Sequence, residues 1–116
     1  MTKDYTQITK DISEYMGEIR KLVPEATTGF TALAKAAVKD GALSEKTKEF
    51  IALAIGVTTR CDGCIGFHAK ALARLGATRE EVAETLAMCI YLGGGPSYMY
   101  AADALRAFDQ FAKPAA

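Results

Sequence analysis

The sequence has no run of apolar residues long enough to cross a membrane and no run of basic residues that could hold a nucleic-acid backbone. A membrane span requires roughly 18 consecutive apolar residues. The 14 basic side chains are balanced by 14 acidic ones, so nucleic acid is not expected as a partner. Residues 1–15 lack the continuous apolar segment of a signal peptide. We therefore predict a cytoplasmic protein with neither a membrane partner nor a nucleic-acid partner.

Cysteine and histidine are scarce, because the 116 residues include only three cysteines and one histidine. An odd number of cysteines in a cytosolic chain suits redox or metal chemistry better than a framework of structural disulfides. The chain is long enough for one hydrophobic core and too short for two. We expect a single domain over residues 1–116.

The first half of the chain predicts three helices. Apolar residues recur at steps of three and four from Tyr5 onward, so a first helix is expected to end at Pro24. A second helix is expected over residues 25–39. Ser44 is a suitable N-cap for a third helix that runs towards Thr59, where two adjacent β-branched residues weaken helical structure.

The second half of the chain predicts three more helices. A fourth is expected over residues 61–76. Thr78 and Glu81 have the spacing of a capping box, which opens a fifth helix over residues 79–92. The glycine-rich segment 93–96 then breaks the chain before a sixth helix. No window alternates apolar and polar residues as a strand does, so the sequence predicts an all-α bundle of six helices.

The predicted helix over residues 79–92 is apolar on more than one face. A small monomer has few places to bury such a surface, so part of it is expected in a subunit interface. Cys89 lies in register with Val82 and Leu86, and a free cysteine on an apolar face is expected to pack in the core.

Cys61 and Cys64 form a CxxC pair, and His68 follows four positions after the second cysteine. On a helix that begins near Cys61, these three side chains share one face. A helix N-terminus and a nearby histidine both favour the reactive thiolate, here expected at Cys64. Helical Cα atoms at i and i+3 lie about 5 Å apart, within the range of a disulfide. The residues predict a reversible dithiol centre, with Gly63 leaving one side of the pair open to a substrate.

Zinc sites use the same cysteine spacing and provide the main alternative. A structural zinc ion takes four ligands, and only His68 and Glu49 are available to complete the set. Redox chemistry is therefore the preferred interpretation, and a metal-binding or redox-sensing module is the second.

The segment from Lys48 to Ala71, KEFIALAIGVTTRCDGCIGFHAKA, closely resembles the AhpD-like alkylhydroperoxidase group of the carboxymuconolactone decarboxylase family. The resemblance continues through GATREEVAETL from Gly76 and GGGPSYMYAADAL from Gly93. It implies an all-helical homo-oligomer, commonly a trimer or hexamer, that reduces hydroperoxides without a bound cofactor. It also implies a separate dithiol donor, such as a lipoyl or thioredoxin-like protein, that recycles the disulfide.

The resemblance also implies roles for four residues. Cys64 corresponds to the cysteine that attacks the peroxide and forms a sulfenic acid, and Cys61 to the resolving cysteine. Glu49 and His68 match the proton-relay carboxylate and histidine. One position departs from the best-known alkylhydroperoxidases, which carry a second histidine where this chain has Gly63. The decarboxylase branch generally lacks the cysteine pair, so decarboxylation of a lactone is the least favoured activity, behind disulfide exchange without peroxide turnover.

Overall fold

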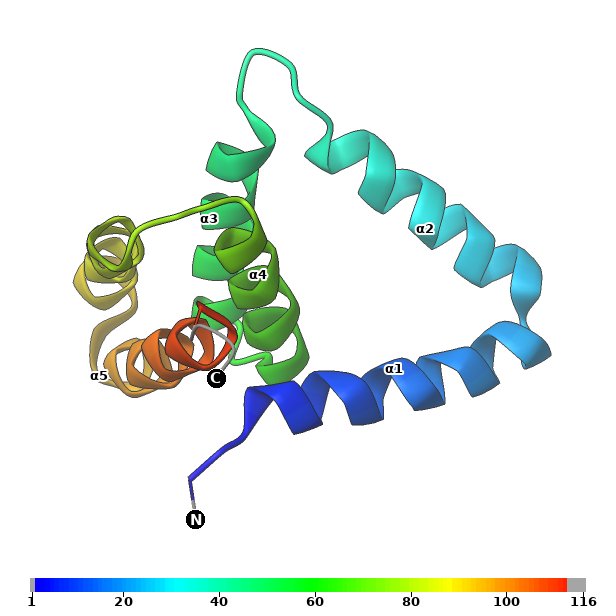
Figure 1. The fold of residues 1–116 in the computed structure, drawn as a ribbon, viewed down its shortest axis with the longest axis horizontal. Helices are drawn as coiled ribbons and strands as arrows, with labels where there is room; N and C mark the ends of the chain where they lie inside the picture. The colour runs from blue at the N-terminus through cyan, green and yellow to red at the C-terminus, as the bar shows by residue number, and fades with distance from the viewer. Residues whose placement is uncertain (1, 113–116) are drawn as a thin grey trace.

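The computed structural model describes residues 2–112, which form helices and no strands, and this confirms the predicted all-α fold. Figure 1 shows part of the chain gathered in a helical body, from which the rest of the helical chain projects as two sides of an open triangle. The projecting helices are α1 (Tyr5–Leu22) and α2 (Pro24–Val38), and the body consists of α3 (Glu45–Thr58), α4 (Asp62–Arg74) and α5 (Arg79–Ala112).

The predicted break between the last two helices is confirmed, because α5 joins two helical segments across a kink. The backbone leaves helical geometry at Gly94, where φ is 74° and ψ is −155°, a conformation essentially restricted to glycine. Helical geometry then resumes with Pro96 in the first turn of the second segment, where the missing proline N–H is not needed. The chain thus turns at Gly94, inside the segment 93–96 where the sequence predicts the break between the fifth and sixth helices.

Local capping sets several helix ends where the sequence predicts them. Pro24 occupies the first turn of α2. The Ser44 hydroxyl accepts a hydrogen bond of 3.1 Å from the backbone N–H of Thr47 at the start of α3. At the start of α5, the backbone N–H of Thr78 donates to the Glu81 carboxylate at 2.9 Å, and the N–H of Glu81 donates back to the Thr78 hydroxyl at 3.1 Å. The capping box is confirmed.

The hydrophobic core lies between α3, α4 and α5, and the first turns of α1 close one end of it. Burial of a large aliphatic side chain stabilises a fold by about 1.5–3 kcal/mol, so the fully buried residues hold the body together. These residues include Tyr5, Leu53, Val57, Ile65, Leu72 and Val82.

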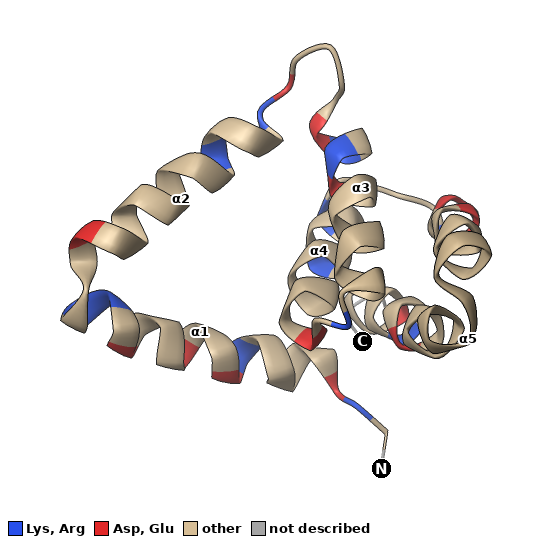
Figure 2. Cartoon of the chain, turned by 180° about the vertical axis from the view of Figure 1, so that it is seen from behind, with Lys and Arg blue, Asp and Glu red and all other residues tan. Residues whose placement is uncertain are grey.

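The apolar stripe of α1 is buried only in its first half. Tyr5 is fully buried, whereas Tyr15 and Ile19 are exposed. No residue of α2 is buried, and its Phe30 and Leu33 side chains are 67% and 64% exposed. Figure 2 shows little charge along α2. The single chain therefore leaves an exposed apolar surface on α1 and α2.

Within residues 2–112, no helix combines the length and the apolar character that crossing a membrane requires.

Candidate active site

The Cys61–Cys64 pair lies at the start of α4 and is joined by a disulfide, with the two Cα atoms 5.2 Å apart. Cys61 is the N-cap residue of α4, and its sulfur accepts a hydrogen bond of 3.1 Å from the backbone N–H of Cys64. The sequence predicts that the helix N-terminus acts on Cys64, but this amide points to the sulfur of Cys61. Both cysteines are partly exposed.

The turn between α3 and α4 places Cys61 at the helix start. Arg60 adopts the left-handed conformation with a φ of 58°, and the backbone N–H of Cys61 donates to the Gly56 carbonyl at 2.9 Å. Arg60 thus ends α3 in the left-handed conformation that glycine most often adopts at the C-terminus of a helix. The lack of a side chain at Gly56 lets α4 approach, because a Cβ there would lie only 3.0 Å from the Cβ of Cys64.

Glu49 and His68 form a hydrogen-bonded pair across α3 and α4. The Nδ1 atom of His68 lies 3.0 Å from Oε2 and 3.2 Å from Oε1 of Glu49. Glu49 is only 4% exposed, so it is not a solvated helix carboxylate. The His68 side chain is 31% exposed. With the proton on Nδ1, His68 donates to Glu49 and leaves Nε2 available as a base.

His68 follows Cys64 by four residues in α4, and helical side chains at this spacing have Cβ atoms about 5–6 Å apart. Glu49 and Gly56 are seven residues apart in α3 and lie on the same face. One face of α3 therefore meets both Cys64 and His68. The structure brings the four predicted residues, Glu49, Cys61, Cys64 and His68, to the contact between α3 and α4.

The prediction that Gly63 leaves one side of the cysteine pair uncovered is wrong. A Cβ at Gly63 would lie 3.0 Å from the terminal methyl group of Ile12, so α1 already occupies that side. The same contact bears on the second relay histidine of the best-known alkylhydroperoxidases, which Gly63 replaces. An imidazole at this position would have to displace Ile12.

A further cluster beside the disulfide has no sequence signal. The Tyr5 hydroxyl donates to Oδ1 of Asp62 at 2.9 Å, and the Lys3 ammonium donates to the same oxygen at 3.0 Å. Lys3 also donates to Asp103 at 2.9 Å. Lys3 and Asp62 are 59 positions apart, so no local motif links them. Burial, with the bond to Asp62, raises the pKa of Tyr5 far above its ordinary value, so its hydroxyl remains a donor.

Cys89 packs in the core as predicted and is 3% exposed. Its thiol contacts the backbone carbonyls of Ala54 and Thr85 at 3.7 Å and 3.6 Å. Burial raises the pKa of this thiol, which disfavours the reactive thiolate.

Comparison with known proteins identifies the family. Residues 24–107 match the family model described as "Carboxymuconolactone decarboxylase family". The chain belongs to this family. It is 42% identical over 109 residues to an uncharacterized protein of Cupriavidus necator, covering 94% of this chain and 96% of that protein. It is 40% identical over 108 residues to an uncharacterized protein of Haemophilus influenzae, covering 93% and 96%.

A solved structure of a carboxymuconolactone decarboxylase family protein shares the fold. The apo crystal structure of this protein from Legionella pneumophila is 58% identical to the chain, with a TM-score of 0.92. The match covers 94% of this chain and 97% of the Legionella chain. The family resemblance predicted from the sequence is confirmed.

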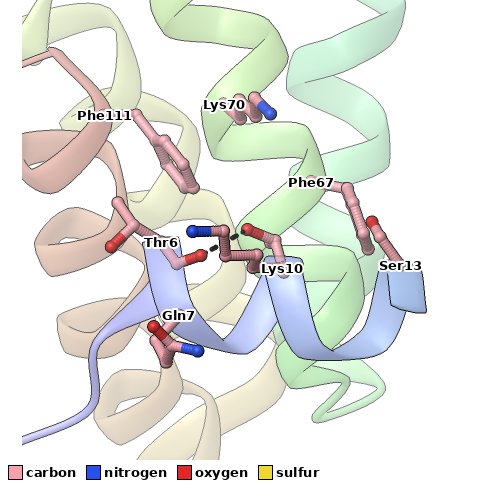
Figure 3. A pocket seen from close by; sticks show the side chains of 8 residues that line it. Thr6, Gln7, Lys10, Ser13, Phe67, Lys70 and Phe111 are labelled. Carbon is pink, nitrogen blue, oxygen red and sulfur yellow. Dashed lines mark hydrogen bonds between the residues drawn. The ribbon is translucent and has the colours of Figure 1, made fainter. Parts of the chain in front are cut away.

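A cavity of about 380 Å³ is lined by α1, α4 and the end of α5, and none of the four predicted site residues lines it. Figure 3 shows Lys10, Lys70, Phe67 and Phe111 among its labelled side chains. Among residues 2–112, no group of three or more histidine, cysteine and acidic side chains is arranged to hold a metal ion.

Proposed function

We propose that this protein is a thiol-dependent peroxidase that reduces organic hydroperoxides through the Cys61–Cys64 pair. The observation that carries the proposal is the buried Glu49 carboxylate bonded to His68, the single histidine, one turn along α4 from Cys64. A carboxylate that orients a histidine beside a thiol is a general arrangement for activating a nucleophile. Membership of a family that contains both peroxidases and decarboxylases is consistent with an enzyme.

The first step oxidises Cys64 and reduces the peroxide. His68 accepts the proton of the Cys64 thiol, and the Glu49 carboxylate stabilises the imidazolium that forms. The thiolate attacks the terminal oxygen of the hydroperoxide, so an S–O bond forms while the O–O bond breaks. The alkoxide leaves and takes the proton from His68 to become an alcohol. Cys64 is now a sulfenic acid.

The second step forms the disulfide. The Cys61 sulfur attacks the Cys64 sulfur, an S–S bond replaces the S–O bond, and the hydroxyl leaves as water with the Cys61 proton. The Cα separation of 5.2 Å allows this bond without a large movement of the helix. The product is the oxidised state described above.

An external dithiol then restores the two thiols and is itself oxidised to a disulfide. Attack of a donor thiolate on Cys64 expels Cys61, whose sulfur already accepts the N–H of Cys64. A stabilised leaving thiolate speeds thiol–disulfide exchange. Small dithiols of the lipoyl class, or a thioredoxin-like protein, supply the chemistry this step requires. In the complete cycle, one hydroperoxide and one dithiol give one alcohol, one water and one disulfide.

Disulfide exchange without peroxide turnover is the second candidate, because it uses the same cysteine pair. Both reactions use a base to form the attacking thiolate, but only peroxide reduction also expels an alkoxide, a strongly basic leaving group that needs a proton donor. The buried carboxylate thus favours peroxidase chemistry. Decarboxylation leaves no role for the cysteine pair.

We also propose that the exposed apolar surface of α1 and α2 is buried in a homo-oligomer, a trimer or hexamer. Phe30 lies with Met16, Ile19 and Val23 along an apolar groove at the junction of the two helices. On the body, Ile55, Tyr91 and Leu92 are also exposed. Contiguous apolar surface of this kind marks a protein contact, and a second copy offers matching surface.

A single-turnover experiment tests the proposed peroxidase function. Reduced protein, freed of reductant, is mixed with one equivalent of cumene hydroperoxide, and free thiols and the alcohol product are measured together. We expect two thiols to disappear for each alcohol formed. Thiols that persist with the peroxide unchanged, in a protein whose disulfide is reducible, would reject peroxidase function and favour disulfide exchange.

A further inference from the structure

We propose that Lys3 sets the reduction potential of the Cys61–Cys64 pair by neutralising the carboxylate of Asp62, the residue between Cys61 and Gly63 in the motif. The inference rests on the proposed redox use of the pair. It assigns Lys3 as a positioning and charge-balancing residue outside the Glu49–His68 relay.

The geometry places one cation on the carboxylate closest in sequence to the disulfide. Lys3 donates to Oδ1 of Asp62 at 3.0 Å and to Oδ2 of Asp103 at 2.9 Å, and its ammonium lies 5.0 Å from the ring centre of Tyr100. The side chains of Lys3 and Asp62 are 35% and 39% exposed. The bond to Asp103, with that to Asp62, raises the pKa of Lys3 despite partial burial. Lys3 therefore stays charged.

The chain before α1 is fixed in register, so the position of Lys3 is not left to a flexible end. The Gln110 side-chain amide donates to the Lys3 carbonyl at 3.0 Å, and its oxygen accepts the backbone N–H of Tyr5 at 2.7 Å. The Tyr5 ring is fully buried while its hydroxyl reaches Asp62. One side chain of α5 thus holds both donors, Lys3 and Tyr5, against the start of α4.

The sign of the effect follows from the charge of the reduced state. Reduction of the disulfide creates thiols and thiolate at the start of α4, and the Asp62 carboxylate in the same helical turn destabilises a thiolate there. Lys3 offsets this repulsion and so favours the reduced form. Other ionisable groups near the pair include Arg60 directly before Cys61, Glu49 and His68 on the α3 side, and Asp103 beyond Lys3. Removing Lys3 alone should make the disulfide harder to reduce.

The test compares Lys3→Met and Asp62→Asn by equilibrating each protein with glutathione buffers and measuring the fraction of disulfide. We expect Lys3→Met to lower the equilibrium constant for reduction about threefold, about 14 mV for a two-electron couple, at low salt. Asp62→Asn should raise it by a similar factor, and the double variant should return close to the wild type. The Lys3→Met shift should shrink in 1 M salt, where the screening length is about 3 Å.

Two variants control for indirect effects. Lys3→Arg keeps the charge and should keep the wild-type equilibrium constant. Lys21→Met removes a lysine that forms an exposed ion pair with Glu18 within α1. This variant should keep the wild-type equilibrium constant for reduction. Shifts of the same sign for Lys3→Met and Asp62→Asn, or an unchanged constant in Lys3→Met, would overturn the inference. The assay contains no peroxide, so it tests the inference separately from the proposed function. If the two variants show these opposite shifts but the protein has no peroxidase activity, the proposed function is rejected and the inference stands.

Discussion

The Glu49 carboxylate and the His68 imidazole lie within hydrogen-bond distance, with Oε2 3.0 Å from Nδ1. Glu49 belongs to α3 and His68 to α4, and Glu49 is buried whereas His68 is partly exposed. The imidazole is therefore held through Nδ1 from its buried side, and this bond does not use its other nitrogen. This relationship supports the first two predictions.

Glu49→Gln should lower kcat/KM for cumene hydroperoxide by about 100-fold or more, because general acid–base groups contribute about 10²–10⁴ to a rate. The amide keeps the shape of the side chain and removes the charge that stabilises the imidazolium. Stopped-flow peroxide consumption measures this loss. Glu45→Gln is the matched control, since Glu45 is a carboxylate on the same helix that pairs with Arg74 at the surface. Equal rates in Glu49→Gln and the control would contradict the relay.

Glu49→Gln combined with His68→Asn should be no slower than the slower of the two single variants. Residues that act as one unit show strongly non-additive losses. The comparison uses the kcat/KM of all four proteins in the same buffer. Losses that multiply in the double variant would mean that Glu49 and His68 act independently.

Cys61→Ser should trap the oxidised intermediate. Without the resolving thiol, Cys64 stays as a sulfenic acid after one equivalent of peroxide, and Cys89 is too buried to replace Cys61. Mass spectrometry after labelling with a sulfenic-acid reagent should place the label on Cys64. In Cys64→Ser, no label is expected on Cys61. A label on Cys61 in this variant would mean that Cys61 is the attacking cysteine. The hydrogen bond from the Cys64 backbone N–H to the Cys61 sulfur is the reason to test this outcome.

Gly94→Ala should lower the free energy of unfolding by about 1–3 kcal/mol, because an alanine at a φ of 74° and a ψ of −155° is strained. Urea unfolding measures the change. Gly95→Ala is the matched control, since its backbone φ is not positive and a Cβ there meets no atom within 4 Å. A loss of stability in Gly95→Ala alone would contradict the assignment of the bend to Gly94.

Phe30→Glu should reduce the mass of the particle in light scattering, because a charge in an apolar contact opposes association. Thr28→Glu places the same charge 200° around α2 and should preserve the oligomer. A monomeric wild type would contradict the proposed assembly, as would a mass that Phe30→Glu leaves unchanged.

The features that the sequence predicts well are local. The capping box at Thr78 and Glu81 and the start of α4 at the cysteine motif each depend on residues within a few positions of one another. The pairing of Glu49 with His68 joins α3 to α4, and its expectation came from the family resemblance. Residue spacing alone is compatible with either a solvated or a partly buried Glu49.

The features that the sequence does not predict depend on contacts between distant segments. Ile12 covers Gly63 because α1 crosses the start of α4, and no periodicity in α1 reveals that crossing. The bonds from Lys3 and Tyr5 to Asp62 depend on the same crossing. Glycine and proline mark the kink at Gly94 in the sequence, but they do not predict which glycine leaves helical geometry or how the second segment is directed.

Steady-state consumption of cumene hydroperoxide with dihydrolipoamide as reductant tests the peroxidase function most directly. Wild-type protein and Cys89→Ala should both turn over, because Cys89 lies in the core. Cys64→Ser should show no turnover above the reductant alone, since the attacking sulfur is gone. Turnover that survives in Cys64→Ser, or no turnover in a wild type whose Cys61–Cys64 disulfide is fully reduced by the donor, would contradict a thiol peroxidase.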